Sequence, residues 1–153
     1  MEYKYLLGKK FELGKQDCLT LVFDFYKHNY GIEIKNYARP DNYWGNGLDL
    51  LTQFVQKEGF VYIDENPHNW QTGDVFMMAL GAEFPTHCAV YIGNNKIIHH
   101  LPDRASTEEQ YRGAYRNYTV ARVRHKSQFG RKEEYGKLNL LDDPRLARLR
   151  DKL

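Results

Sequence analysis

The sequence has few cysteines, no long apolar run and almost no excess of charge. Only Cys18 and Cys88 occur among 153 residues, too few for a disulfide framework. No stretch approaches the roughly 20 apolar residues that span a membrane, and residues 1–7 are too polar for a secretory signal. A net charge of +2 does not require a nucleic-acid partner. These absences predict a protein made in a cytoplasm without a signal peptide, with no membrane span and no nucleic-acid partner.

What is present suits one α+β domain. Hydrophobic residues make up 42% of the chain, enough for a core without disulfides. Helical periodicity and stop signals predict helices over 2–9, over 17–29 and from Leu48 to Gly59. Segments rich in β-branched and aromatic residues then predict strands over 74–80, 87–92, 96–101 and 118–124. Helices followed by an antiparallel sheet are the α+β pattern.

The composition becomes charged from about Lys126. We therefore predict a domain over residues 1–126 and a charged C-terminal extension over 127–153. Asp143 and Pro144 are typical of the start of a helix, and leucines at 146, 149 and 153 give that helix a thin apolar stripe. A helix this short is marginal alone in water, so we expect it to dock on a partner.

Cys18 stands where the second helix is expected to begin. Asp17 is a good N-cap, which makes Cys18 the first helical residue. Free backbone N–H groups and the helix dipole at that position lower the pKa of a thiol and face any developing negative charge. A buried, inert cysteine is the ordinary alternative; it is our expectation for Cys88 and stays open for Cys18 on this feature alone.

A cysteine nucleophile needs a base and a group that orients the base. His87, His99 and His100 lie on two adjacent strands of one expected hairpin. Because side chains alternate between faces, a two-residue loop at 94–95 would put His87 on the face of His100, whereas a three-residue loop at 93–95 would put it on the face of His99. The residues alone leave this choice open.

A metal site is a further possibility, built from His87, His99, His100 and a cysteine. None of these residues has the helical i,i+4 or Cys-x-x-Cys spacing of common zinc sites. We therefore expect no metal and no cofactor.

Three segments resemble the NlpC-type papain-like cell-wall cysteine peptidases. Residues 14–22 resemble the cysteine box of that family, 71–75 its Gly-Asp strand start and 87–99 its histidine hairpin. The third catalytic group of the family lies on the strand after the histidine strand, and the spacing of 99 − 87 = 12 places it at His99. The resemblance spans about residues 6–125. It implies a papain-like fold in which the catalytic residues are Cys18, His87 and His99.

More narrowly, the chain is similar to the branch found in tail-tip assembly proteins of long-tailed bacteriophages and gene-transfer agents. The supporting segments are 43–47, 99–106 and 111–116. This resemblance implies hydrolysis of amide bonds in peptidoglycan peptide stems, phage tail-tip proteins as partners and a place in the virion tail tip. We expect Tyr43, Trp44 and His100 to bind substrate. The alternative is a catalytically silent structural module of a tail tip.

Two positions depart from the pattern of this family. Phe11 stands where many relatives have a Tyr that helps to line the oxyanion site, and Leu19 stands where a Ser commonly follows the cysteine.

Overall fold

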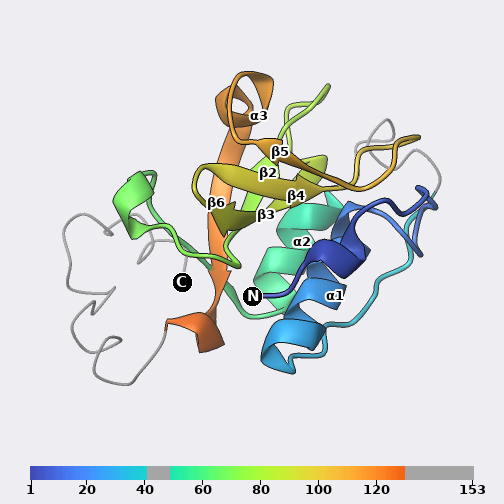
Figure 1. The fold of residues 1–153 in the computed structure, drawn as a ribbon, viewed down its shortest axis with the longest axis horizontal. Helices are drawn as coiled ribbons and strands as arrows, with labels where there is room; N and C mark the ends of the chain where they lie inside the picture. The colour runs from blue at the N-terminus through green and yellow to red at the C-terminus, as the bar shows by residue number, and fades with distance from the viewer. Residues whose placement is uncertain (41–48, 130–153) are drawn as a thin grey trace.

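The computed structural model describes residues 1–40 and 49–129 (Figure 1). Within them one antiparallel sheet has the strand order β1-β6-β2-β3-β4-β5. The strand bounds are β1 Phe60–Tyr62, β2 Val75–Met78, β3 His87–Gly93, β4 Lys96–His99, β5 Thr107–Gln110 and β6 Thr119–His125. The helices are α1 Cys18–Tyr30, α2 Leu50–Lys57 and α3 Ala114–Asn117, with 3-10 turns η1 Lys4–Leu6, η2 Pro67–Asn69 and η3 Lys126–Gln128. The predicted α+β class is confirmed.

The central helix α1 begins and ends at the predicted signals. The Asp17 carboxylate accepts the Thr20 backbone N–H, and the Thr20 hydroxyl accepts the Asp17 N–H, which together form a capping box. At the other end Gly31 adopts the left-handed conformation (φ +67°), which glycine takes without steric cost. These two caps fix Cys18 as the first residue of the helix.

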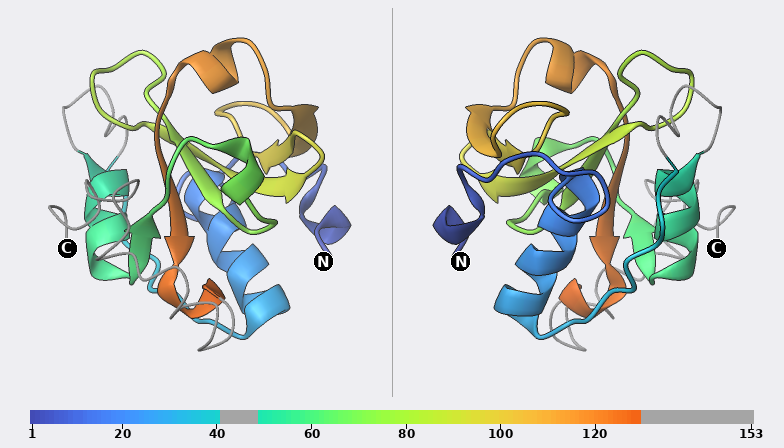
Figure 2. Two further views of the ribbon diagram at one scale, coloured as in Figure 1. Left: turned by 90° about the vertical axis from the view of Figure 1, so that its left-hand side faces the viewer. Right: turned by 90° about the vertical axis from the view of Figure 1, so that its right-hand side faces the viewer.

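Alternation along the strands divides the core into two clusters. On one face of the sheet Val75, Cys88 and Val90 pack against α1 and α2. On the other face Phe76 and Ala89 belong to a second cluster, with aromatic residues from the loops and from the segment after β5. Figure 2 shows α1 and α2 at one end of the molecule and α3 at the other. The buried helix α1 packs directly against strand β3.

The segment before β2 anchors the sheet to the end of α1. Asp74 is fully buried, and its carboxylate accepts hydrogen bonds from Arg124 on β6 and from the Gln71 backbone N–H. Gly73 has φ +100°, and a Cβ at this position would lie 2.2 Å from the Tyr30 hydroxyl. Only glycine fits this close approach, which explains the Gly-Asp pair in the sequence.

The β3–β4 hairpin combines features of both predicted loops. Asn94 and Asn95, both at positive φ, form a two-residue turn that pairs Gly93 with Lys96. The register then shifts between Tyr91 and Gly93, because a bulge adds one residue to β3. The turn is that of the two-residue loop, but the bulge gives the pairing expected of the three-residue loop.

The structure corrects several element predictions. The helix expected over 2–9 is wrong, since this segment contains only the 3-10 turn Lys4–Leu6. The pattern analysis missed β1, β5 and α3, which are short and lack a regular apolar repeat. The start of the third helix at Leu48 and the short C-terminal helix lie outside the described residues.

The first residues of the predicted extension contact the sheet. Phe129 is buried in the second cluster with the Arg124 guanidinium over its ring, and the Gln128 carbonyl accepts from Gln71. The boundary between residues 126 and 127 stays a prediction. In the described ranges no helix is long and apolar enough to cross a bilayer.

Candidate active site

A pocket of about 120 Å³ opens where the N-terminus of α1 meets the start of β3. Cys18 lines it from the helix and His87 from the strand, and the backbone conformations described above bring these two residues together. Both side chains are buried, at 6% and 3% exposure, so the thiol and the imidazole are largely shielded from water. The rest of the lining consists of Phe11, Leu13, Asp17, Leu80, Thr86, His100, Leu101 and Pro102.

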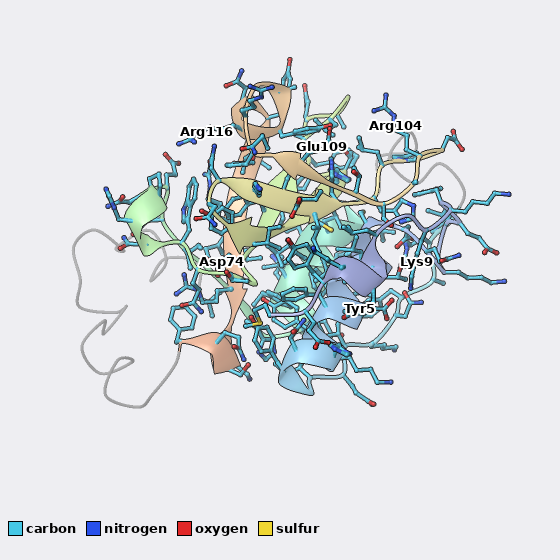
Figure 3. All side chains as sticks on the ribbon, in the orientation of Figure 1. Tyr5, Lys9, Asp74, Arg104, Glu109 and Arg116 are labelled. Carbon is cyan, nitrogen blue, oxygen red and sulfur yellow. The ribbon has the colours of Figure 1, made fainter. Side chains whose placement is uncertain are left out.

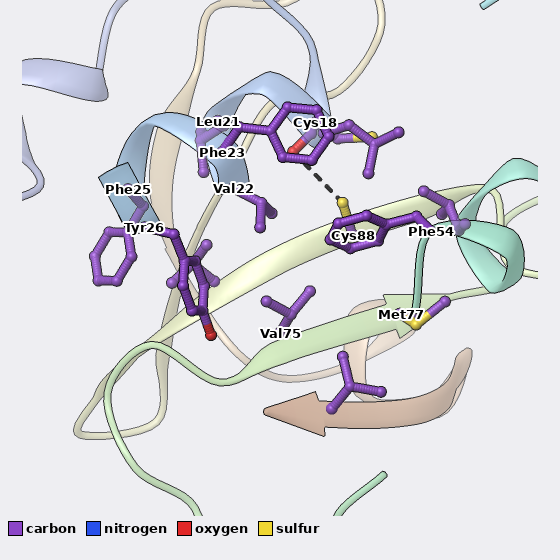
Figure 4. Packing of buried hydrophobic residues seen from close by; sticks show 14 of the residues in the cluster. Cys18, Leu21, Val22, Phe23, Phe25, Tyr26, Phe54, Val75, Met77 and Cys88 are labelled. Atoms are coloured by element: carbon purple, nitrogen blue, oxygen red, sulfur yellow. Dashed lines mark hydrogen bonds between the residues drawn. The ribbon is translucent and has the colours of Figure 1, made fainter. Parts of the chain in front are cut away.

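Cys88 lies beside Cys18, although its side chain projects from the opposite face of β3 to His87. The Cys88 Sγ is 3.4 Å from the Cys18 carbonyl oxygen, as the dashed line in Figure 4 shows. Hydrogen bonding between the two cysteine side chains lowers the pKa of Cys18; burial opposes this, and His87 lowers the pKa further, to about 5. The same contact with Cys18, together with burial, raises the pKa of Cys88. Cys18 therefore has thiolate character, whereas Cys88 stays a thiol.

His87 is hydrogen-bonded to His99, which lies on the same face of the sheet. The His87 Nε2 and the His99 Nδ1 are 2.9 Å apart, and the two residues are diagonal neighbours on β3 and β4. Because Nε2 of His87 is engaged with His99, its Nδ1 is the nitrogen that remains for Cys18. The structure thus brings together the three residues that the sequence singled out, with His99 rather than His100 beside His87.

Beyond His99 the polar contacts continue to Glu109 on β5. The His99 Nε2 contacts the Glu109 Oε2, which also accepts a hydrogen bond from the Tyr115 hydroxyl at 2.8 Å. Burial, aided by the charge of His87, lowers the pKa of His99 to about 4 against the effect of Glu109. Burial opposes ionisation of Glu109, but the bonds from Tyr115 and His99 outweigh it and the pKa of Glu109 is lowered. At neutral pH a neutral His99 therefore faces a carboxylate.

Sequence reasoning missed Glu109 because strand β5, with the sequence Thr-Glu-Glu-Gln, shows no apolar alternation. Its only signal was position, two strands beyond His87 in a meander of antiparallel strands.

Asp17 holds the N-terminus of α1 through a buried ion pair. Arg39 donates from Nε to Asp17 Oδ2 at 2.5 Å and from a terminal nitrogen to Oδ1 at 3.0 Å, and both side chains are at most 2% exposed. The Gly14 backbone N–H donates to the same carboxylate. Burial opposes ionisation of Asp17, but the bonds from Arg39 and from backbone N–H groups lower its pKa. The residue before the nucleophile candidate is therefore a fixed, paired anion.

His100 and Phe11 also line the pocket and contact each other. Their rings meet edge to face with centroids 5.4 Å apart, and the His100 Nε2 is 2.9 Å from the Arg104 carbonyl oxygen. His100 is thus placed to contact a ligand, whereas Phe11 offers no hydroxyl. Tyr43 and Trp44 lie outside the described residues. Residues 1–40 and 49–129 contain no group of three or more His, Cys, Asp or Glu side chains arranged to hold a metal.

Comparison with known proteins gives consistent matches. The NlpC/P60 family pattern matches residues 3–124. Tail tip assembly protein K of Escherichia phage lambda is 33% identical over 123 residues, covering 80% of this chain and 60% of that protein. Tail tip assembly protein K of Escherichia phage N15 is 32% identical over 123 residues, covering 79% and 49%. The chain thus spans only about half to 60% of the length of these relatives.

Among solved structures, the NlpC/P60 domain of the peptidoglycan hydrolase SagA superposes with a TM-score of 0.51. Sequence identity is 13%, and the match covers 78% of this chain and 90% of that one. A likeness at this identity shows a shared fold. The family match over residues 3–124 shows that the chain is a member of the NlpC/P60 family.

Proposed function

We propose that this protein is a cysteine peptidase that hydrolyses amide bonds in peptidoglycan peptide stems. The observation that best supports this is the shared pocket of Cys18 and His87, with His87 oriented by His99. NlpC/P60 proteins are generally cysteine peptidases and peptidoglycan hydrolases, and the low pKa of Cys18 provides the thiolate that such chemistry requires.

In the first step the Cys18 thiolate attacks the carbonyl carbon of the scissile amide and forms a C–S bond. The oxyanion that develops lies near the N-terminus of α1, where the Cys18 backbone N–H is free to donate. His87 holds the former thiol proton and transfers it to the leaving nitrogen as the C–N bond breaks. The product is a thioester on Cys18 and a free amine.

In the second step water hydrolyses the thioester. His87, now neutral, accepts a proton from the water as its oxygen attacks the thioester carbon. The C–S bond breaks, the carboxylic acid product leaves, and the thiolate–imidazolium pair is restored. His99 keeps the His87 ring oriented through both steps by its bond to Nε2.

We further propose that this activity is used at a phage tail tip, with tail-tip proteins as partners. Support comes from the two relatives named as tail tip assembly proteins. Those names also favour a second candidate, an assembly module that makes no use of its pocket, because neither name refers to hydrolysis.

Digestion of purified peptidoglycan, followed by mass spectrometry of the released fragments, tests the proposal. We expect wild type to release fragments with cleaved peptide stems and Cys18→Ala to release none. Cys88→Ser is the matched control, since it removes the other thiol while its hydroxyl can still donate a hydrogen bond to Cys18, so it should keep activity. If a folded wild-type protein cuts no stem, the assembly module becomes the better hypothesis.

A further inference from the structure

We propose that Glu109 is a positioning residue, which fixes the tautomers of His99 and His87 so that the correct nitrogen of His87 is free to accept the Cys18 proton. This inference deepens the proposed peptidase function and rests on it. It starts from three side chains that step across three adjacent strands on one face of the sheet, His87 on β3, His99 on β4 and Glu109 on β5.

The strand register places these residues in a diagonal row. Ala89 pairs with His99, so His87 is offset by two residues on the same face; Ile97 pairs with Glu109, which is offset from His99 in the same way. Diagonal neighbours lie within reach of long side chains. Glu109 is labelled on β5 in Figure 3, and Tyr115 from α3 holds the same carboxylate oxygen.

The direction of every hydrogen bond in the row follows from the carboxylate. An ionised carboxylate can only accept, so His99 must carry its proton on Nε2. His99 is neutral, with a pKa of about 4, and its Nδ1 is therefore an acceptor. The His87 Nε2 must then be the donor across the 2.9 Å contact. This leaves Nδ1 of a neutral His87 unprotonated and facing Cys18, which is the tautomer that a base requires.

Without the carboxylate, the donor and the acceptor of the His87–His99 hydrogen bond are no longer fixed. A neutral histidine can donate or accept through either ring nitrogen, so His99 could equally carry its proton on Nδ1 and donate to His87. His87 would then hold its proton on Nδ1 and point it at Cys18, where it could not accept another. A histidine as third residue therefore needs a group behind it that only accepts, and Glu109 provides it.

Other charged groups around the row do not replace Glu109. The titratable and charged side chains that interact with His99 or Glu109 are His87 on β3, His100 after β4, Arg104 before β5 and Tyr115 on α3. In the described part of the chain, Glu109 is the carboxylate bonded to the row.

The test uses Glu109→Gln, which keeps the size of the side chain but can both donate and accept. We expect kcat to fall about 10- to 100-fold, the range for a hydrogen bond to a charged group, with KM little changed.

Glu108→Gln is the matched control. Glu108 is the adjacent residue of β5, projects from the opposite face and accepts a hydrogen bond from the Tyr3 hydroxyl. The variant removes the same charge from a side chain that does not bond the row, so we expect kcat to stay at its wild-type value. Thermal unfolding of both variants shows whether each is folded.

A second measurement does not depend on activity. In a Cys18→Ala background, ¹⁵N NMR of the imidazole rings reports which nitrogen of His87 and His99 carries the proton. We expect both rings to be protonated at Nε2, and Glu109→Gln to populate the Nδ1 form. Unchanged tautomers in Glu109→Gln would overturn the proposal. If wild type cuts no peptide stem, the proposed function fails, while the NMR result still decides the role of Glu109.

Discussion

Replacing Arg39 by Met should strongly destabilise the fold, because it leaves the Asp17 carboxylate buried without its cation. Asp17 and Arg39 are at most 2% exposed and share two hydrogen bonds. Breaking a buried pair by removing one partner costs about 3–5 kcal/mol. Two backbone donors, at Gly14 and Thr20, still bond the carboxylate, so we expect the lower end, about 3 kcal/mol. For a domain of this size that corresponds to a Tm lower by about 6–12 °C.

The loss of stability caused by Arg39→Met should depend on pH. The pKa of Asp17 is lowered in the folded state. Its ionisation therefore stabilises the fold above the pKa of the unfolded carboxyl, and this stability is lost as the pH falls through the folded-state pKa. The difference between wild type and Arg39→Met should accordingly be largest near neutral pH and shrink in acid, where Asp17 is protonated in the variant.

Urea unfolding at two pH values measures both effects, and a double mutant tests the cause. Asp17→Asn with Arg39→Met removes both charges and keeps an oxygen that can cap Thr20, so it should recover about 2 kcal/mol relative to Arg39→Met alone. Lys15→Met is the control, since its pair with Glu12 is exposed and should contribute nothing measurable. A double mutant no more stable than Arg39→Met would refute the argument from an unpaired buried charge.

The remaining predictions concern the site. Mild iodoacetamide should label Cys18 before Cys88, because the pKa of Cys18 is about 5 and that of Cys88 is raised; earlier labelling of Cys88, located by peptide mapping, would reverse the assignment of the nucleophile. The labelling rate should rise with pH through about 5 and then level off, and a rise centred above pH 8 would mean that the thiolate is not stabilised. His99→Ala should lower kcat/KM by about 10- to 100-fold, whereas His100→Ala should mainly raise KM, since only His99 is bonded to His87. The reverse order in folded variants, measured on a soluble stem peptide, would exclude His99 as the third residue.

The course of α1 could be read from the sequence because its determinants are local. Asp17, Thr20 and Gly31 set the ends of the helix through contacts within one turn, so the position of Cys18 followed from propensity and capping alone. The strands β2, β3, β4 and β6 were also recognisable from their composition. In contrast, β5 is polar and exists because it pairs with β4 along its whole length, which no pattern within the segment reveals.

The sequence by itself determined the α+β class, the helix that presents Cys18 and the set of histidines from which a base could come. The residues alone left open which histidine lies on the same face as His87. The segment around Gly93 permits both a plain two-residue turn and a two-residue turn followed by a one-residue bulge, and the bulge moves His87 to the face of His99. The family resemblance favoured His99, the tertiary structure showed His99 bonded to His87, and only the tertiary structure placed Glu109 behind His99. The physical reason is that register and cross-strand contacts depend on hydrogen bonds between distant segments, whereas a helix and its caps depend on neighbours along the chain.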